Sequence, residues 1–284
     1  MSEDPSIPVP ETLEYTSSID LRDAYLELLK RSLSHTLYTG ADAMGFSSRR
    51  RSVRLLVRGL ARRGIVQLRV LPDGERQRAE GRVLPLFAQT MVGLGRLENV
   101  RHAIETVLDE DVPGDLIETG VWRGGASIFM RGVLAAHGNL DRTVWLADSF
   151  QGLPPPRPDR YPEDAGAEWH SATELAVGVE EVRENFRRYG LLDDRVRFLP
   201  GWFRDTLPAM REHQWALVRL DGDMYESTWD ALTNLYGGLA PGGFLIVDDY
   251  SIDSCRQAVE DFRRAEEIDA PLSEIDWTGV FWRK

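Results

Sequence analysis

Hydrophobic residues between positions 114 and 248 form short apolar runs, separated by stretches with helical spacing. The apolar runs predict five strands, at Asp115–Thr119, Thr143–Asp148, Val196–Pro200, Ala216–Asp221 and Phe244–Asp248. Helices are expected after these strands, beginning near Gly125, Thr173, Asp205, Ser227 and Ser254. Strands that alternate with helices predict an α/β fold, in which a mostly parallel sheet carries helices on both faces.

The N-terminal part of the chain has helical periodicity only. Apolar residues recur at helical spacing from Leu21 to Leu37, where Asp20 can serve as the N-cap, and again from about Leu84 to Leu108. The first dozen residues are rich in proline and are expected to form a disordered tail. We therefore expect residues 1–110 to be a helical extension of the α/β domain.

The C-terminal end predicts two further strands, at Leu272–Trp277 and Gly279–Arg283. Together with the five strands before them they make a sheet of seven. The α/β domain is thus expected to cover residues 111–284.

Composition and charge narrow the classes of function. The 284 residues include no apolar stretch near the roughly 18 residues that a membrane span requires. The N-terminus is acidic and polar, unlike a secretory signal, and the single Cys255 excludes an intrachain disulfide. We therefore expect a cytoplasmic protein with no membrane partner. A net charge of −12 also disfavours nucleic acid as a partner.

One segment, residues 49–69, runs against this balance, because it carries eight arginines and no acid. Val53, Leu56, Val57 and Leu60 lie near helical spacing, which predicts a basic amphipathic helix. Such a helix can bind an anionic partner or a membrane surface, or it can pack on an acidic face of its own chain or of a second subunit. The second interpretation is favoured, since charge runs are usually solvated faces.

A glycine-rich turn, ETGVWRGGAS at 118–127, follows the first predicted strand. Ligands of parallel sheets bind beyond the carboxyl ends of the strands, and glycine lets a ligand approach the backbone closely. A dinucleotide fingerprint would need glycine at the positions of Glu118 and Arg123. A carboxylate in this turn repels phosphate and attracts a cation. The motif therefore favours S-adenosylmethionine, which has a sulfonium and no phosphate, over NAD.

The ends of the second and third predicted strands add further candidate ligand contacts. These are Asp148, Ser149, Phe150, Gly201, Trp202 and Phe203. Asp148 stands about thirty residues after the glycine turn, where an acid can accept both ribose hydroxyls. The alternative is a helix cap. The aromatic residues can flank an adenine, and ordinary core packing is the alternative for them.

Four carboxylates follow the fourth and fifth predicted strands: Asp221 and Asp223, then Asp248 and Asp249. Like charges packed together repel strongly unless a cation neutralises them. Neither motif contains a lysine, and the nearest base is Arg219. Carboxylate oxygens suit a hard divalent cation such as Mg²⁺, whereas solvated acids that cap helices are the alternative.

These motifs resemble those of the macrocin O-methyltransferases, which methylate deoxysugars on macrolide antibiotics, and of related sugar methyltransferases of natural products. The similarity spans most of the chain and rests on YLELLKRSLSHTLY at 25–38, ETGVWRGG at 118–125, LADSFQG at 146–152, LDGDMY at 220–225, PGGFLIVDDY at 241–250 and the closing GVFWRK. The resemblance implies a Rossmann-like class I methyltransferase fold. It also implies a homo-oligomeric enzyme (a dimer or tetramer) that uses S-adenosylmethionine and Mg²⁺ to methylate a sugar hydroxyl of a glycosylated metabolite.

The resemblance also assigns roles residue by residue. Asp221, Asp248 and Asp249 match the family's metal ligands, and Asp223 matches its proposed general base, so Asp221 and Asp223 form the expected catalytic group. The motifs and the resemblance together place the cofactor against Glu118, Thr119, Gly120, Val121, Trp122, Ser127, Asp148, Ser149, Phe150, Gly201, Trp202, Phe203 and Asp221. The segment 154–171, rich in proline and acids, is expected to cover the site as a lid.

Three other functions remain open at this point. A metal-dependent methyltransferase for catechols or other phenols needs the same chelating diol, so the core motifs do not separate it from a sugar methyltransferase. A non-catalytic methyltransferase-like protein that binds a ligand or partner is disfavoured by the intact set of carboxylates. Nucleic-acid binding through residues 49–69 is the weakest alternative.

Overall fold

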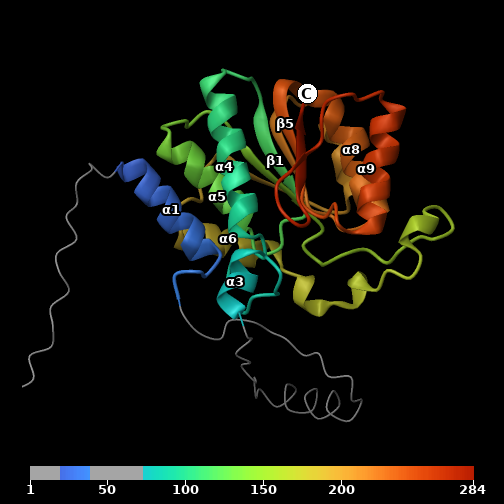
Figure 1. Cartoon of the computed structure of the whole chain (residues 1–284), viewed down its shortest axis with the longest axis horizontal. Helices are drawn as coiled ribbons and strands as arrows, with labels where there is room; N and C mark the ends of the chain where they lie inside the picture. The colour runs from blue at the N-terminus through green and yellow to red at the C-terminus, as the bar shows by residue number, and fades with distance from the viewer. Residues whose placement is uncertain (1–19, 39–72) are drawn as a thin grey trace, which may run out of the picture.

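The computed structural model describes residues 20–38 and 73–284 (Figure 1). The expected N-terminal tail and the expected basic helix at 49–69 lie outside the described residues. Within the described part of the chain, no helix is long and apolar enough to cross a membrane.

A seven-stranded sheet of order β3-β2-β1-β4-β5-β7-β6 forms the centre of the molecule. Its five parallel strands are β1 (Asp115–Thr119), β2 (Val144–Asp148), β3 (Val196–Pro200), β4 (Trp215–Leu220) and β5 (Leu239–Val247). The last two, β6 (Ser273–Glu274) and β7 (Val280–Arg283), are antiparallel. The mostly parallel sheet is thus confirmed, although β6 is far shorter than the expected Leu272–Trp277.

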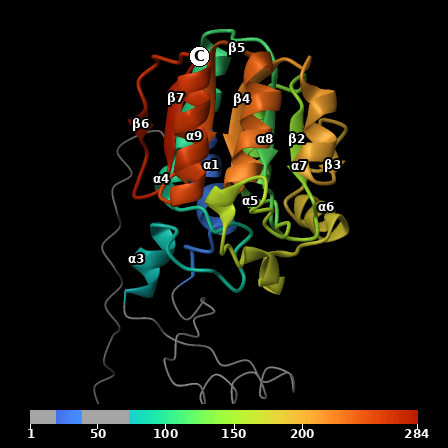
Figure 2. The same ribbon diagram turned by 90° about the vertical axis from the view of Figure 1, so that its right-hand side faces the viewer.

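Helices cover both faces of the sheet, as Figures 1 and 2 show. One layer contains α4 (Leu94–Asp109), α5 (Gly125–Ala136) and α6 (Val179–Arg188), with α1 (Leu21–Leu33) packed on the outside of α5. The opposite layer contains α7 (Phe203–Thr206), α8 (Tyr225–Leu235) and α9 (Asp253–Ala265), and the short α3 (Gly74–Ala79) lies beyond the sheet edge. Each face buries its own apolar cluster, built around Phe129 on one side and Trp215 on the other.

Two helix boundaries in the extension differ from the sequence expectation. The helix expected from about Leu84 begins only at Leu94, because the preceding loop folds over the glycine turn. Carbonyl groups of Leu86 and Ala88 in this loop each accept a hydrogen bond from Arg123 at 2.9 Å. Helix α1 begins as expected, with Asp20 accepting from the backbone N–H of Arg22 at 2.9 Å, but it ends at Leu33 rather than Leu37.

Two further helices are also shorter than expected or begin later. The helix predicted from about Thr173 is only a single 3-10 turn there, and α6 begins at Val179. The helix predicted near Asp205 is reduced to the four residues of α7, followed by a 3-10 turn that contains Pro208. Both differences lie in the connections around the carboxyl edge of the sheet.

Candidate active site

The glycine turn is built by the contact between the ends of β1 and β4. Gly120 has a φ of 86°, and a Cβ atom at this position would lie 1.6 Å from the carbonyl oxygen of Asp221. Only glycine fits such a backbone approach. The turn therefore lies directly against the first residue of the acidic motif that follows β4.

Asp148 at the end of β2 braces this turn. Its carboxylate accepts hydrogen bonds from the backbone N–H groups of Val121 and Phe150, each at 2.7 Å. Burial raises the pKa of Asp148, whereas these backbone hydrogen bonds act to lower it. Its role toward a ribose stays a prediction.

Glu118 lies beneath the turn and is 2% exposed. Its carboxylate accepts from the Ser127 hydroxyl and, at 2.6 Å, from Nη1 of Arg219. Burial raises the pKa of Glu118 to about 7, although the neighbouring Arg219 guanidinium opposes this shift. Glu118 thus supports the turn from the protein side.

A pocket of about 740 Å³, counting its part open to solvent, lies above these groups, within the range of small-molecule sites. Eight of the residues expected at the cofactor line it: Gly120, Val121, Trp122, Asp148, Ser149, Trp202, Phe203 and Asp221. The others of that set do not line it: Glu118, Thr119, Ser127, Phe150 and Gly201. Ten further lining residues were not expected at the cofactor, although Pro154 belongs to the expected lid: Met91, Gly152, Leu153, Pro154, Leu175, Arg204, Gly222, Glu226, Ser227 and Asp230.

The acidic residues meet beside one end of this pocket, where Asp221 lines it. Carboxylate oxygens of Asp221, Asp248 and Asp249 all lie within 4.8 Å of one another, and Asp223 also lines the pocket. Burial, followed by repulsion from Asp221 and Asp248, raises the pKa of Asp223 to about 7. The pKa of Asp249 is raised well above its usual value for the same reasons. The cluster is therefore short of positive charge.

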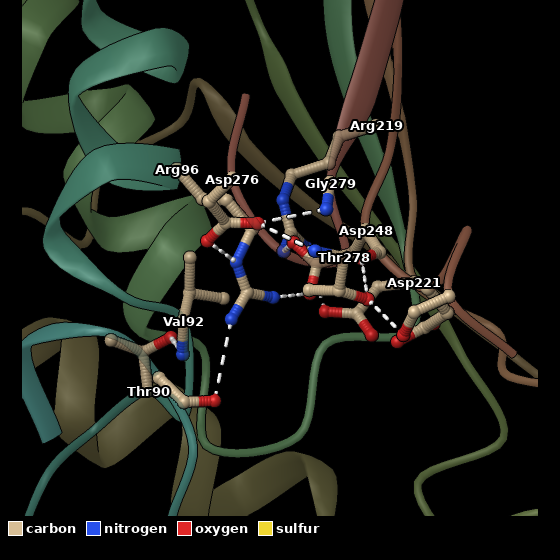
Figure 3. A network of polar contacts seen from close by, with 12 residues as sticks. Thr90, Val92, Arg96, Arg219, Asp221, Asp248, Asp276, Thr278 and Gly279 are labelled. Atoms are coloured by element: carbon tan, nitrogen blue, oxygen red, sulfur yellow. Dashed lines mark hydrogen bonds and ion pairs between the residues drawn. The ribbon is translucent and has the colours of Figure 1, made fainter. Parts of the chain in front are cut away.

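Two arginines partly neutralise the cluster, and neither role follows from the sequence motifs (Figure 3). Arg219 on β4 donates to Asp221 at 2.9 Å and also to one oxygen of Asp248. Arg96 on α4 donates to the other oxygen of Asp248. Arg219 could have been recognised from the sequence, because an arginine within the otherwise apolar strand β4 needs a buried carboxylate partner. The contact of Arg96 has no local signal.

Three non-glycine residues at or near the same strand ends have a strained backbone. Trp122, Phe150 and Asp223 have φ angles of 48°, 55° and 59°, in the left-handed region that non-glycine residues rarely adopt. Such strain persists only where the surrounding structure holds it, and it clusters at functional sites.

The segment expected to be a lid does border the pocket, through Pro154 and, slightly further along the chain, Leu175. Asp164 in its middle accepts from the backbone N–H groups of Tyr225 (2.7 Å) and Glu226 (3.0 Å) at the start of α8. His170, later in the same segment, is exposed. The segment is thus anchored to the catalytic domain while its edge faces the pocket.

The sheet order, the glycine turn and the carboxylate pocket at the carboxyl edge define a Rossmann-like class I methyltransferase. The model of the family described as macrocin O-methyltransferase (TylF) matches residues 22–284. The chain belongs to this family and is an O-methyltransferase.

Named relatives agree with this assignment. The chain is 51% identical to 8-demethyl-8-(2,3-dimethoxy-alpha-L-rhamnosyl)-tetracenomycin-C 4'-O-methyltransferase of Streptomyces olivaceus, over 93% of this chain and 94% of that protein. It is 46% identical to demethyldecarbamoylnovobiocin O-methyltransferase of Streptomyces niveus, over 98% of each chain. Among solved structures, the O-methyltransferase NovP matches with a TM-score of 0.78 and 46% identity, over 93% of this chain and 99% of that one.

Proposed function

We propose that this enzyme transfers the methyl group of S-adenosylmethionine to a sugar hydroxyl of a glycosylated natural product in antibiotic biosynthesis, with a Mg²⁺-like cation at Asp221, Asp248 and Asp249. The observation that carries the proposal is the convergence of these three carboxylates beside the pocket, which Asp221 lines together with the Gly120 turn. The relative from Streptomyces olivaceus, named for a rhamnosyl-bearing acceptor, supports a sugar as the substrate.

The residues of the pocket fit S-adenosylmethionine in their chemistry. The Gly120 turn lines the pocket, and Asp148 offers carboxylate oxygens to ribose hydroxyls. Trp202 and Phe203 offer flat apolar surfaces for an adenine. The excess of carboxylates suits a ligand that carries a sulfonium and an ammonium.

The acidic cluster also fits a hard divalent cation. Three carboxylates on two neighbouring strand ends provide the oxygen ligands that Mg²⁺ prefers. The hydrogen bonds from the arginines do not exhaust Asp248, because each carboxylate oxygen accepts at two sites. When bound, such a cation lowers the pKa of a coordinated hydroxyl and stabilises the alkoxide that forms.

Asp223 is the residue that we expect to accept the proton of the acceptor hydroxyl. It lines the pocket two positions after Asp221, and among the described residues its side chain forms no hydrogen bond. A carboxylate that lines the pocket and forms no hydrogen bond of its own can accept a proton from a hydroxyl beside it. The surrounding residues orient the hydroxyl toward the methyl group, since a displacement needs an in-line approach.

We further propose a division of labour along the chain. Residues 111–284 form the catalytic domain, and residues 1–110 contribute contacts with the acceptor and with other subunits of a homo-oligomer in the cytoplasm. The position of Met91 in the pocket supports the first role. The exposed Leu21 and Leu28 on α1 support the second, which light scattering of the purified chain would test.

An acceptor screen tests the proposed reaction. Purified enzyme and S-adenosylmethionine are incubated with glycosylated natural products, with their aglycones and with catechols, each with Mg²⁺ or with EDTA. We expect Mg²⁺-dependent methylation of glycosides only. Methylation of catechols alone would favour the phenol methyltransferase, and no transfer to any acceptor would favour the non-catalytic binding protein.

A further inference from the structure

Arg96 connects the N-terminal extension to the acidic cluster. It lies on α4, is only 5% exposed, and bonds through Nη1 to one oxygen of Asp248. Its Nε donates to Asp276, in the loop before β7, at 3.0 Å (Figure 3). Because Arg219 bonds to the other oxygen of Asp248, guanidinium groups hold both oxygens of this carboxylate.

The surroundings are shaped to admit the Arg96 side chain. A Cβ atom at Gly279 would lie 2.9 Å from its Cδ, and a Cβ at Gly81 would lie 2.3 Å from its Nη2. The Trp277 ring lies beside the guanidinium, with 5.9 Å between the ring centroid and Cζ. The Arg96 side chain thus lies between the loop that contains Gly81 and the loop that contains Trp277 and Gly279, which indicates a built position.

The balance of charge around Arg96 indicates the role of this residue. Five carboxylates meet at the strand ends, and two guanidiniums bond to them: Glu118, Asp221, Asp223, Asp248 and Asp249, with Arg96 and Arg219. Carboxylates so close together cannot all stay ionised in a folded protein unless positive charge is present. Arg219 reaches three of the five, whereas Arg96 reaches only Asp248.

We propose that Arg96 is a positioning residue that acts as the resident counter-ion of Asp248. It holds this carboxylate in place before the cation binds, and it competes with the cation for the same carboxylate, so it weakens cation binding. The inference rests on the cation site of the proposed function. Through Arg96, the N-terminal extension sets the cation affinity of that site and keeps the site assembled without metal.

Arg96→Met removes the charge and keeps much of the side chain's volume. If Arg96 is a counter-ion, its loss destabilises the metal-free protein more than the metal-bound one, because the cation replaces the missing charge. Mn²⁺ titration followed by electron paramagnetic resonance should then give a dissociation constant lower by about tenfold. The rise in Tm caused by Mg²⁺ should be larger than in the wild type. Arg96→Lys, which keeps the charge, should stay near the wild type in both measurements.

Arg131 provides a matched control. It is 2% exposed on α5 and forms an ion pair with Asp193, away from the pocket. Arg131→Met should lower the Tm equally with and without Mg²⁺ and leave the Mn²⁺ dissociation constant unchanged.

Asp276→Asn tests the same inference in the opposite direction, and it does not depend on the folding of Arg96→Met. It removes the second carboxylate partner of Arg96, so the guanidinium interacts more strongly with Asp248. Mn²⁺ should bind more weakly than in the wild type.

The outcomes distinguish the counter-ion role of Arg96 from the proposed cation site. Tighter Mn²⁺ binding by Arg96→Met and weaker binding by Asp276→Asn support the counter-ion role. Unchanged or weaker binding by Arg96→Met, while the wild type binds Mn²⁺, overturns that role and leaves the proposed function intact. If neither the wild type nor any variant binds Mn²⁺, the metal part of the proposed function fails, and the counter-ion role fails with it.

Discussion

Four aspartates lie at or beside the acidic end of the pocket, and their surroundings differ. Asp248 is buried and held by two arginines, whereas Asp223 is half-buried and its carboxylate has no hydrogen bond among the described residues. A carboxylate that is held in place suits a metal ligand, and one that is free suits a base. The local contacts are thus compatible with the division of roles that the family resemblance implies, which stays a prediction.

Asp223→Asn should lower kcat by a factor on the order of 10² to 10⁴, because the amide cannot accept the proton of the acceptor hydroxyl. The dissociation constant of S-adenosylmethionine should stay nearly the same. Steady-state kinetics and calorimetry measure the two effects, and Asp205→Asn, at an exposed site on α7, is the control. An unchanged kcat in Asp223→Asn would remove this residue from the role of base.

Asp230 gives a pH-dependent stability that can be measured. Burial and the nearby Glu226 raise the pKa of Asp230 to about 6, against 3.8 in the unfolded chain. The folded state therefore binds more protons between these values, so this group costs stability as the pH rises from 4 to 7. The cost is at most about 3 kcal/mol.

Asp230→Asn should remove this cost. The free energy of unfolding of the variant minus that of the wild type should increase as the pH rises from 4 to 7. Urea unfolding at several pH values measures the difference. A difference that does not change with pH would show that Asp230 titrates normally in the folded protein.

Elements are joined at the site by contacts that span long stretches of sequence. Helix α8 begins at Tyr225 without a side-chain cap from its own N-cap residue, Met224. Asp164 of the lid segment takes the place of that cap, since it accepts from two of the first backbone N–H groups of the helix. The lid and the helix that follows the acidic motif are therefore stabilised together.

Asp164→Ala should lower the free energy of unfolding by about 0.5 to 2 kcal/mol, the usual loss for a missing cap. It should also expose the segment 154–171 to trypsin at Arg160, because one anchor of the segment is gone. Asp159→Ala, at an exposed lid position, is the control and should change neither property. Equal tryptic cleavage of the two variants would show that Asp164 does not anchor the lid.

The strands and the glycine turn were predictable because their signals are local. An apolar run such as that of β4 and the turn at Gly120 can each be recognised from a few consecutive residues. The helix start at Leu94 was not predictable, because the loop before it is held by the distant Arg123. The same reason hid the contact between Arg96 and Asp248, which are 152 positions apart.

The chain as a unit builds its pocket from both expected parts. Most lining residues belong to residues 111–284, but Met91 comes from the extension, and Arg96 reaches the acidic cluster from the same side. The family match from residue 22 onward agrees with an extension that belongs to the enzyme's common architecture. Sequence patterns predicted candidate catalytic residues, and the fold adds contacts from the extension that complete their surroundings.

The most direct measurement is calorimetric titration of S-adenosylmethionine into the purified full chain, with and without Mg²⁺, followed by a methyl-transfer assay on a glycosylated acceptor under both conditions. We predict saturable binding of the cofactor at one site per chain, and transfer that requires Mg²⁺ and stops when EDTA removes it. Absence of cofactor binding under every metal condition would contradict the proposed function. Binding with full transfer in EDTA would contradict the role of the carboxylate cluster as a metal site.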